Sequence, residues 1–215
     1  ALTLMTGGNI HVNSTDTTPQ AGNSGTLTIQ ARQVNLSDGA NLRAGAFGAG
    51  HGGTLHLQVS ETLNVTNAAI DTNSYDNANL ENAGDAGNLM IQARNVKLTN
   101  GAQLGSATFG TGQGGMLSLK VSETLTITGQ ATKNRSSGVF ASSMSDQLDM
   151  AGAAGNLDIE ARQIVLQDGA KIVSNTYGTG RGGTIHLQAF ETLTVSGHGA
   201  INHSPSGVYA GSLNH

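Results

Sequence analysis

The sequence predicts an all-β fold, a parallel β-helix (β-solenoid) built from triangular coils of three short strands. Two observations predict it. One stretch occurs three times, at residues 48–65, 110–127 and 178–195, and a long repeat of nearly constant period is typical of stacked, quasi-one-dimensional folds. Within the repeats, apolar and polar residues alternate over short runs, which is typical of strands with one buried face.

Composition narrows the classes of function. The chain has 215 residues, including 31 Gly, 2 Pro and no Cys or Trp, and only 11% of its residues are charged. Proteins average roughly a quarter charged residues, so amides, hydroxyls and backbone must supply solubility here. A net charge of −4 without a basic stripe argues against nucleic-acid binding. Lack of Cys excludes disulfides and thiol chemistry, and no apolar run approaches the roughly 20 residues that membrane insertion requires.

A second recurring segment precedes each copy of the first, so each long repeat contains two related coils. The A coils begin in segments 21–46, 83–107 and 151–175, and the B coils begin in the three stretches given above. The predicted domain is a single repeat segment over 1–215, with a partial coil at 1–20 and long repeats at about 21–82, 83–150 and 151–215. This organisation predicts about six to seven coils, and we expect them to belong to a longer array.

The alternation assigns the inward positions of each coil. In the first A and B coils these are Leu27, Ile29, Val34, Leu36, Ala40, Leu42, Ala44, Leu55, Leu57, Leu63, Val65 and Ile70. The tripeptides 37–39, 99–101 and 167–169 all end in Asp-Gly or Asn-Gly. Such pairs tolerate positive φ, so they mark the corner before the third strand of each A coil.

Variable loops leave the B coils, and loops on one edge of a solenoid usually carry its binding surface. The candidate interaction residues in or near these loops are Tyr75, Asp76, Glu81, Asp85, Asp146 and Asp149. Their carboxylates suit a weak calcium site, but neither the EF-hand spacing nor the calcium-binding nonapeptide is present, so a solvated loop is favoured. No other cofactor is expected. Aromatic residues there could stack on sugars, although covering an edge of the core is the favoured use.

Charged residues recur at one corner of every coil. Arginines follow the first strand of the A coils and glutamates occupy the equivalent place in the B coils. The predicted structural charge column is Arg32, Glu61, Arg94, Glu123, Arg162 and Glu191. Because A and B coils alternate, neighbours in this column should lie about 5 Å apart with opposite charge. Their repetition favours a structural role over catalysis.

Two other motifs have a functional and a structural interpretation. The Gly-x-Gly-x-Gly-Gly runs at 48–53, 110–115 and 178–183 resemble phosphate-binding loops, but a strand rather than a helix is expected after each. A tight crossing between coils is the favoured interpretation. His56 and His186 occupy matching outward positions with Ser118 between them, which separates them too far to share a metal ion.

Four motifs recur in the repeats: Gly-Asn-Leu-x-Ile-x-Ala-Arg at 155–162, Gly-Ala-x-Ile at 169–172, the glycine run at 178–183 and Glu-Thr-Leu-Thr-Val at 191–195. In these motifs the chain resembles the repeats of filamentous haemagglutinin-type exoproteins, the large substrates of two-partner secretion, especially those of cyanobacteria. The resemblance implies a right-handed β-helix, the hand that parallel crossovers generally prefer. It also implies export through an outer-membrane secretion pore and residence at the cell surface or in the medium. The Asn-Pro-containing secretion domain of that family is not found, so the resemblance indicates a shaft segment.

A repeat of this kind is compatible with three functions. The favoured one is a non-enzymatic structural or adhesive segment whose loops attach to cells, glycans or matrix proteins. The alternative is a polysaccharide-degrading β-helix enzyme, a lyase or glycoside hydrolase, which needs convergent acids in one cleft. A surface-binding array for ice or mineral needs identical outward residues. The outward row is too varied for that, since it reads Thr28, His56, Met90, Ser118, Asp158 and His186.

Overall fold

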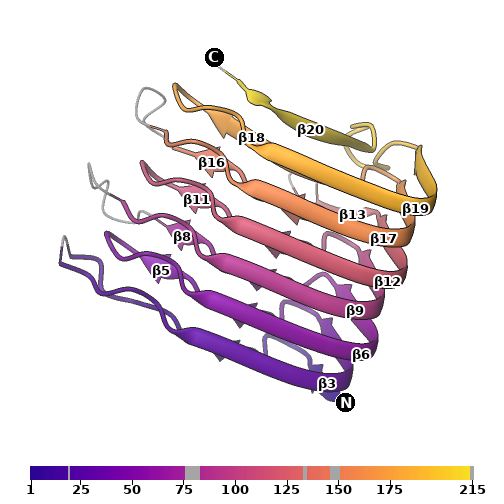
Figure 1. Cartoon of the computed structure of the whole chain (residues 1–215), viewed down its shortest axis with the longest axis horizontal. Coiled ribbons are helices and arrows are strands. Elements are labelled where there is room, and N and C mark those ends of the chain that lie inside the picture. Colours follow the sequence, from indigo (N-terminus) through magenta and orange to yellow (C-terminus); the bar gives the residue numbers. More distant parts are fainter. Residues whose placement is uncertain (19, 76–82, 133–134, 146–150, 214–215) are drawn as a thin grey trace.

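The computed structural model describes residues 1–18, 20–75, 83–132, 135–145 and 151–213. These residues form an all-β solenoid of parallel strands in about six turns, which confirms the predicted fold class. A 7-stranded sheet and an 11-stranded sheet stack along the same axis, and the chain ends lie at opposite ends of the stack (Figure 1). No helix that could span a membrane occurs in the described part of the chain. The hand of the solenoid stays a prediction.

The 7-stranded sheet, here called the long-strand sheet, contains one strand from each coil. Its strands are β1 (Leu2–Leu4), β3 (Thr26–Ser37), β6 (Thr54–Thr66), β9 (Asn88–Thr99), β12 (Met116–Thr128), β17 (Asn156–Gln167) and β19 (Thr184–Ser196). Apart from β1, each runs through the first two strands predicted for its coil, because the backbone ladder continues past the corner. A register shift marks that corner: Ala31 pairs with Val59 and Gln33 with Thr62. Arg32 therefore faces the two residues Ser60 and Glu61, which is a β-bulge.

The 11-stranded sheet, here called the short-strand sheet, forms the third side of the coils. One file of strands is β2 (Asn9–His11), β4 (Asn41–Arg43), β7 (Ala69–Asp71), β10 (Gln103–Gly105) and β15 (Gly138–Phe140). A second file is β5 (Ala46–Phe47), β8 (Ser74–Tyr75), β11 (Thr108–Phe109) and β16 (Ser143–Met144). The files join in β18 (Lys171–Tyr177), which pairs with β20 (Gly207–Ser212). A small hairpin, β13 (Gln130–Thr132) with β14 (Arg135–Ser136), stands beside them.

Side chains create the break between the two files. At the break, the backbone N–H of Gly45 donates to Asn13 Oδ1 at 3.0 Å, and the N–H of Ala107 donates to Asn73 Oδ1 at 2.8 Å. These N–H groups therefore bond an asparagine of the preceding coil instead of a backbone carbonyl. The strands stop there for two residues, 44–45 and 106–107, so this side of these coils consists of two short strands.

The core consists of stacked aliphatic side chains, as the alternation predicted. Ten of the inward residues named from the sequence are at most 2% exposed: Val34, Leu36, Ala40, Leu42, Ala44, Leu55, Leu57, Leu63, Val65 and Ile70. Leu27 and Ile29 are partly buried and pack against the same core. Each fully buried Leu, Ile or Val side chain contributes on the order of 1.5–3 kcal/mol, so successive coils stabilise one another.

The glycine runs have the structural role that the sequence favoured. They stack coil on coil so closely that a Cβ atom on Gly87 would overlap the carbonyl oxygen of Gly53, and one on Gly115 would overlap that of Gly87. Only glycine fits where the backbones of successive coils approach each other this closely. The corners also agree with the prediction, because Asp38 (φ 54°) and Gly39 (φ 83°) both adopt positive φ.

Candidate functional site

A groove of about 760 Å³ runs along the outer face of the short-strand sheet. Alternation along each strand directs one residue into the core and its neighbours into the groove. The row that crosses its floor is Arg43, Asp71, Gly105, Phe140, Val173 and Tyr209, one residue from each successive coil. Amides line both sides, among them Asn41, Gln103 and Asn175. The groove thus combines aromatic, amide and charged groups on one face.

Two aromatic rings reach back along their strands at one end of the groove. The strands β15 and β20 carry the matching sequences Gly-Val-Phe and Gly-Val-Tyr. A Cβ atom on Gly138 would lie 2.8 Å from Cζ of Phe140, and one on Gly207 would lie 2.7 Å from Cζ of Tyr209. Each ring therefore extends back over the glycine two residues before it. Only β18 separates the two strands, which places the rings about 10 Å apart.

A third group of rings is arranged differently. Tyr75 stacks between Phe47 and Phe109, with ring centroids 5.3 and 4.9 Å away and interplanar angles of 15° and 2°. Both faces of the Tyr75 ring are covered in this stack, so the edge of that ring is what remains for a ligand. Tyr75, a residue that we predicted for an interaction loop, thus belongs to a stack between coils. Burial raises the pKa of its phenol, and the nearby charge of Asp71 adds to that shift.

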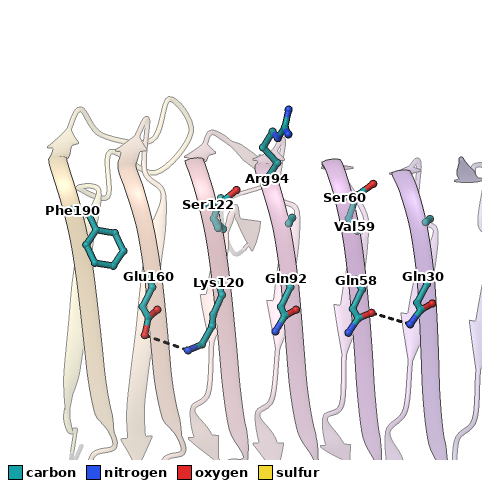
Figure 2. A pocket seen from close by; sticks show the side chains of 13 residues that line it. Gln30, Gln58, Val59, Ser60, Gln92, Arg94, Lys120, Ser122, Glu160 and Phe190 are labelled. Atoms are coloured by element: carbon teal, nitrogen blue, oxygen red, sulfur yellow. Dashed lines mark hydrogen bonds and ion pairs between the residues drawn. The ribbon is translucent and has the colours of Figure 1, made fainter.

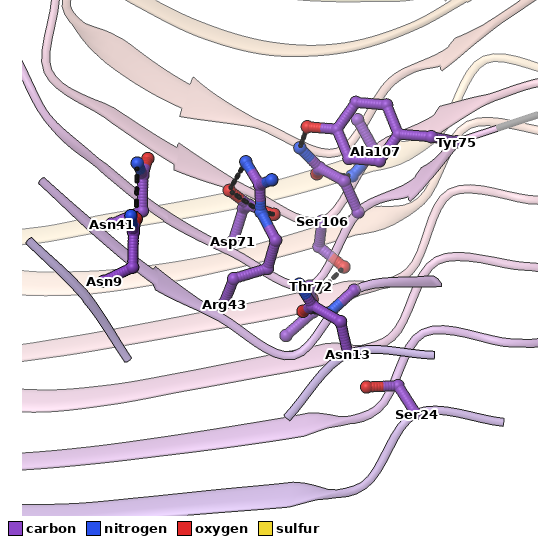
Figure 3. A network of polar contacts seen from close by, with 12 residues as sticks. Asn9, Asn13, Ser24, Asn41, Arg43, Asp71, Thr72, Tyr75, Ser106 and Ala107 are labelled. Carbon is purple, nitrogen blue, oxygen red and sulfur yellow. Dashed lines mark hydrogen bonds and ion pairs between the residues drawn. The ribbon is translucent and has the colours of Figure 1, made fainter. Parts of the chain in front are cut away.

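A buried ion pair lies beside this stack. Nε and Nη2 of Arg43 donate to the Asp71 carboxylate at distances of 2.9–3.1 Å, and Asp71 is 3% exposed (Figure 3). Burial raises the pKa of Asp71, against the attraction of Arg43. Burial also opposes the charge on Arg43, but Asp71 outweighs it, so the pKa of the guanidinium is raised. The raised pKa values favour the charged form of the guanidinium and disfavour the charged form of the carboxyl group.

The groove holds two further cations. Lys171 Nζ donates to Ser204 Oγ at 2.6 Å and lies 5.8 Å from the centre of the Tyr209 ring. Arg135 Nε donates to the carbonyl oxygen of Gly101 at 2.9 Å. Neither forms an ion pair with an acid in the part of the chain that the structure describes. Among those residues, Asp71 is the single carboxylate that lines the groove, so the groove carries excess positive charge.

Of the other predicted loop residues, the structure describes Asp85, which does not line this groove. Asp85 lies between coils, where its Oδ1 accepts the backbone N–H of Gln113 at 2.7 Å and its own N–H donates to Nδ1 of His51 at 3.1 Å. That role is structural. Asp76, Glu81, Asp146 and Asp149 lie outside the described residues.

The residues of the predicted charge column lie at the bulged corner of the long strands, and they are paired only in part. Arg162 bridges two glutamates, with Nε 2.6 Å from Glu191 and Nη1 3.1 Å from Glu123. Its hydrogen bonds lower the pKa of Glu191 and raise its own. Arg32 lies 3.5 Å from Glu61. Arg94 makes no ion pair with the described residues, and Figure 2 shows it extending away from the sheet.

A shallower depression of about 950 Å³ lies on the outer face of the long-strand sheet. Polar side chains at matching positions of neighbouring strands bond one another in this depression (Figure 2). Gln30 Nε2 donates to Gln58 Oε1 at 2.9 Å, and Lys120 Nζ lies 3.5 Å from Glu160 Oε1. These polar groups bond each other across the coils. They therefore stabilise the stack and offer a ligand fewer free groups than the groove does.

One group of potential metal ligands escaped the sequence analysis. Ligand atoms of Asp158, Glu160 and His186 lie within 4.8 Å of one another on the long-strand sheet. His186 Nδ1 is 2.8 Å from Asp158 Oδ1, while Glu160 is engaged by Lys120. The signal was present, since Asp158 and His186 are neighbours in the predicted outward row. With a cation already beside Glu160, this open cluster is a weaker candidate than the groove.

The fold and groove define a class: a parallel β-solenoid with a polar and aromatic groove along its short-strand face. Comparison with known proteins adds no closer identity. The chain matches no protein-family model, no curated protein and no solved structure.

Proposed function

We propose that the chain is a non-catalytic segment of a secreted or cell-surface exoprotein and that its groove binds a polysaccharide chain. The observation that carries the proposal is the pair of rings Phe140 and Tyr209, whose outer atoms lie over glycines on the same face of the groove. The apolar C–H face of a sugar ring packs against an aromatic face, and the Tyr75 ring, which is stacked on both sides, has no face left for such a contact.

The groove's direction also favours an extended polymer. It follows the solenoid axis across several coils, and the two rings are separated by about two strand spacings, roughly 10 Å. A glycan chain that runs along the axis would place every second sugar over a ring. The side-chain amide oxygens of Asn41 and Gln103 can accept hydrogen bonds from sugar hydroxyls, while Asn41 Nδ2 already donates to Asn9 Oδ1 and to the carbonyl oxygen of Gly39.

A polysaccharide-degrading enzyme is the alternative. Glycoside hydrolases use two carboxyl groups about 5–10 Å apart, one on each side of the scissile bond. Of the described groove residues, Asp71 alone carries a carboxyl group, and both of its oxygens accept hydrogen bonds from Arg43. An acid so engaged is poorly placed for proton transfer, which supports binding over cleavage.

Location and export are part of the proposal. The repeat motifs at 155–162 and 178–183 resemble those of filamentous haemagglutinin-type exoproteins, which favours export through an outer-membrane pore and residence at the cell surface or in the medium. The groove would then serve attachment to surface or matrix glycans. We propose no nucleic-acid partner and no cofactor.

A binding and depolymerisation assay on one panel of soluble polysaccharides tests the proposal. We expect saturable binding without release of shortened sugars. Phe140→Ala and Tyr209→Ala should each weaken binding about tenfold, because each removes one stacking surface. Phe190→Ala is the matched control, since Phe190 is 62% exposed but lies on the long-strand sheet. Release of shortened sugars, or equal loss in the Phe190 variant, would contradict the proposal.

A further inference from the structure

The distribution of unpaired cations points to the chemistry of the ligand. Five cationic side chains of the described residues form no ion pair with an acid: Arg94, Lys97, Arg135, Lys171 and Arg181. Arg94, Lys97 and Arg181 are exposed, so water solvates them. Arg135 and Lys171 are half-buried, and both line the groove. The partly buried, uncompensated cations of the described chain thus occur together at one place.

Their setting is unfavourable without an anion. Removing a charge from water costs free energy unless an opposite charge or several hydrogen bonds replace the water. Arg43 has that compensation in Asp71, whereas Arg135 donates to one carbonyl oxygen and Lys171 to one hydroxyl. The chain as a whole carries a net charge of −4, so the positive groove runs against the general charge of the molecule.

The cations also lie where a bound sugar would carry its substituents. Lys171 is the β18 residue that pairs with Gly138 on one side and Gly207 on the other. These two glycines are the ones under the rings of Phe140 and Tyr209. The Lys171 ammonium is therefore beside both stacking surfaces, 5.8 Å from the centre of the Tyr209 ring. An anionic group on a sugar stacked there would meet it directly.

We infer that the groove is specific for an acidic polysaccharide, whose sugar carboxylates bind Lys171 and Arg135. This inference rests on the proposed function and names its ligand class. The remaining N–H groups of Arg135 form a planar fork that matches a carboxylate, and Lys171 supplies a point charge. Sulfate esters share this anionic chemistry, so the test separates the two groups.

The test measures affinity of the whole chain for three probes: polygalacturonate, the same polymer with its carboxyl groups reduced to alcohols, and dextran sulfate. We expect tight binding of polygalacturonate only. Lys171→Gln and Arg135→Gln should each weaken it about fivefold to twentyfold, because each removes a charge-assisted contact. Lys171→Arg should retain binding. Lys97→Gln, which removes an exposed unpaired cation on the long-strand sheet, should leave it unchanged.

The possible outcomes distinguish failure of this inference from failure of the proposed polysaccharide-binding function. Two results would overturn the inference that the ligand is acidic. One is equal affinity for polygalacturonate and its reduced form, and the other is that Lys171→Gln and Arg135→Gln leave the affinity as unchanged as Lys97→Gln does. Either result would still be compatible with a site for a neutral glycan. Preference for dextran sulfate overturns the carboxylate assignment. If Phe140→Ala and Tyr209→Ala change binding to none of the probes and to no other polysaccharide, the proposed function fails and this inference fails with it.

Discussion

Equivalent positions of the three B coils carry different chemistry on the groove floor. In the first B coil, Ala69-Ile70-Asp71 places a carboxylate in the groove, whereas Gly138-Val139-Phe140 and Gly207-Val208-Tyr209 place rings there. The middle residue of each triplet points inward in every case. The core therefore specifies one residue in three, and the flanking residues are free to differ between coils.

Asp71 and the two rings also differ in whether their contacts lie within one coil or between two coils. Asp71 is held by Arg43 of the preceding coil, whereas each ring lies on a glycine of its own strand. An ion pair of this kind joins two coils and depends on both partners. A ring over a glycine is a contact within one strand, and it occurs in both β15 and β20.

The largest expected effect comes from breaking the ion pair. Asp71→Ala should lower the free energy of unfolding by about 2–4 kcal/mol, because it leaves a partly buried guanidinium without its counter-charge. Replacing both partners, as in Arg43→Met with Asp71→Leu, should cost less than Asp71→Ala alone. Urea denaturation of the single and double variants measures the coupling between the residues. Additive losses would mean that the two side chains act independently.

Filling the glycine under a ring should have a somewhat smaller effect. In Gly138→Ala, the new Cβ would overlap the carbonyl oxygen of Lys171 and the Phe140 ring, so we expect a loss of about 2 kcal/mol. Ala69 occupies the matching position where no ring is present, and Ala69→Gly should cost only about 0.5–1 kcal/mol. Thermal denaturation of the two variants compares the sites. Equal losses would show that the ring does not require the glycine.

The pH dependence of stability probes the environment of Tyr75. Its pKa in the folded chain is raised above the ordinary value of 10.0, so folding favours the protonated phenol. This contribution is complete below pH 10 and is lost as the pH rises through the folded-state pKa. The unfolding free energy of the wild-type chain should therefore fall more steeply above pH 10 than that of Tyr75→Phe. Parallel curves would contradict the buried setting of the phenol.

The smallest effect is expected at the exposed charge column, which contrasts with the buried pair. Arg162→Gln should cause a slight loss of thermal stability at low salt, and about 1 M sodium chloride should abolish the difference by screening. Arg94→Gln serves as the control because Arg94 makes no ion pair with described residues. A loss at Arg94 as large as that at Arg162 would show that the glutamate contacts are not its cause.

Much of the stacking could be predicted from the sequence because the repeats align residue above residue. The predicted outward row appears in the strand pairing, in which Thr28, His56, Met90, Ser118, Asp158 and His186 are successive partners. The inward positions predicted from the sequence agree with the observed core for the same reason. The pairing of Arg43 with Asp71 was missed, although each directly follows an inward residue at the matching place, Leu42 or Ile70.

The groove was beyond the sequence analysis, although one of its signals was visible in the matching segments 137–143 and 206–212. Recognising it required knowing that each ring lies back over a glycine and that β18 brings Lys171 between the rings. Ring orientation depends on side-chain torsions, which a pattern of apolar and polar residues does not specify.

The sequence by itself determined the solenoid, its repeat and its core, because period-two alternation and backbone pairing at every coil leave one register that buries the apolar face. The tertiary structure alone decided that the corner residues form one continuous bulged strand and that asparagines such as Asn73 divide the third side in two. It also decided which charges find partners. These features depend on hydrogen bonds and ion pairs between side chains and backbone groups of different coils. Such contacts are fixed only when the coils are stacked.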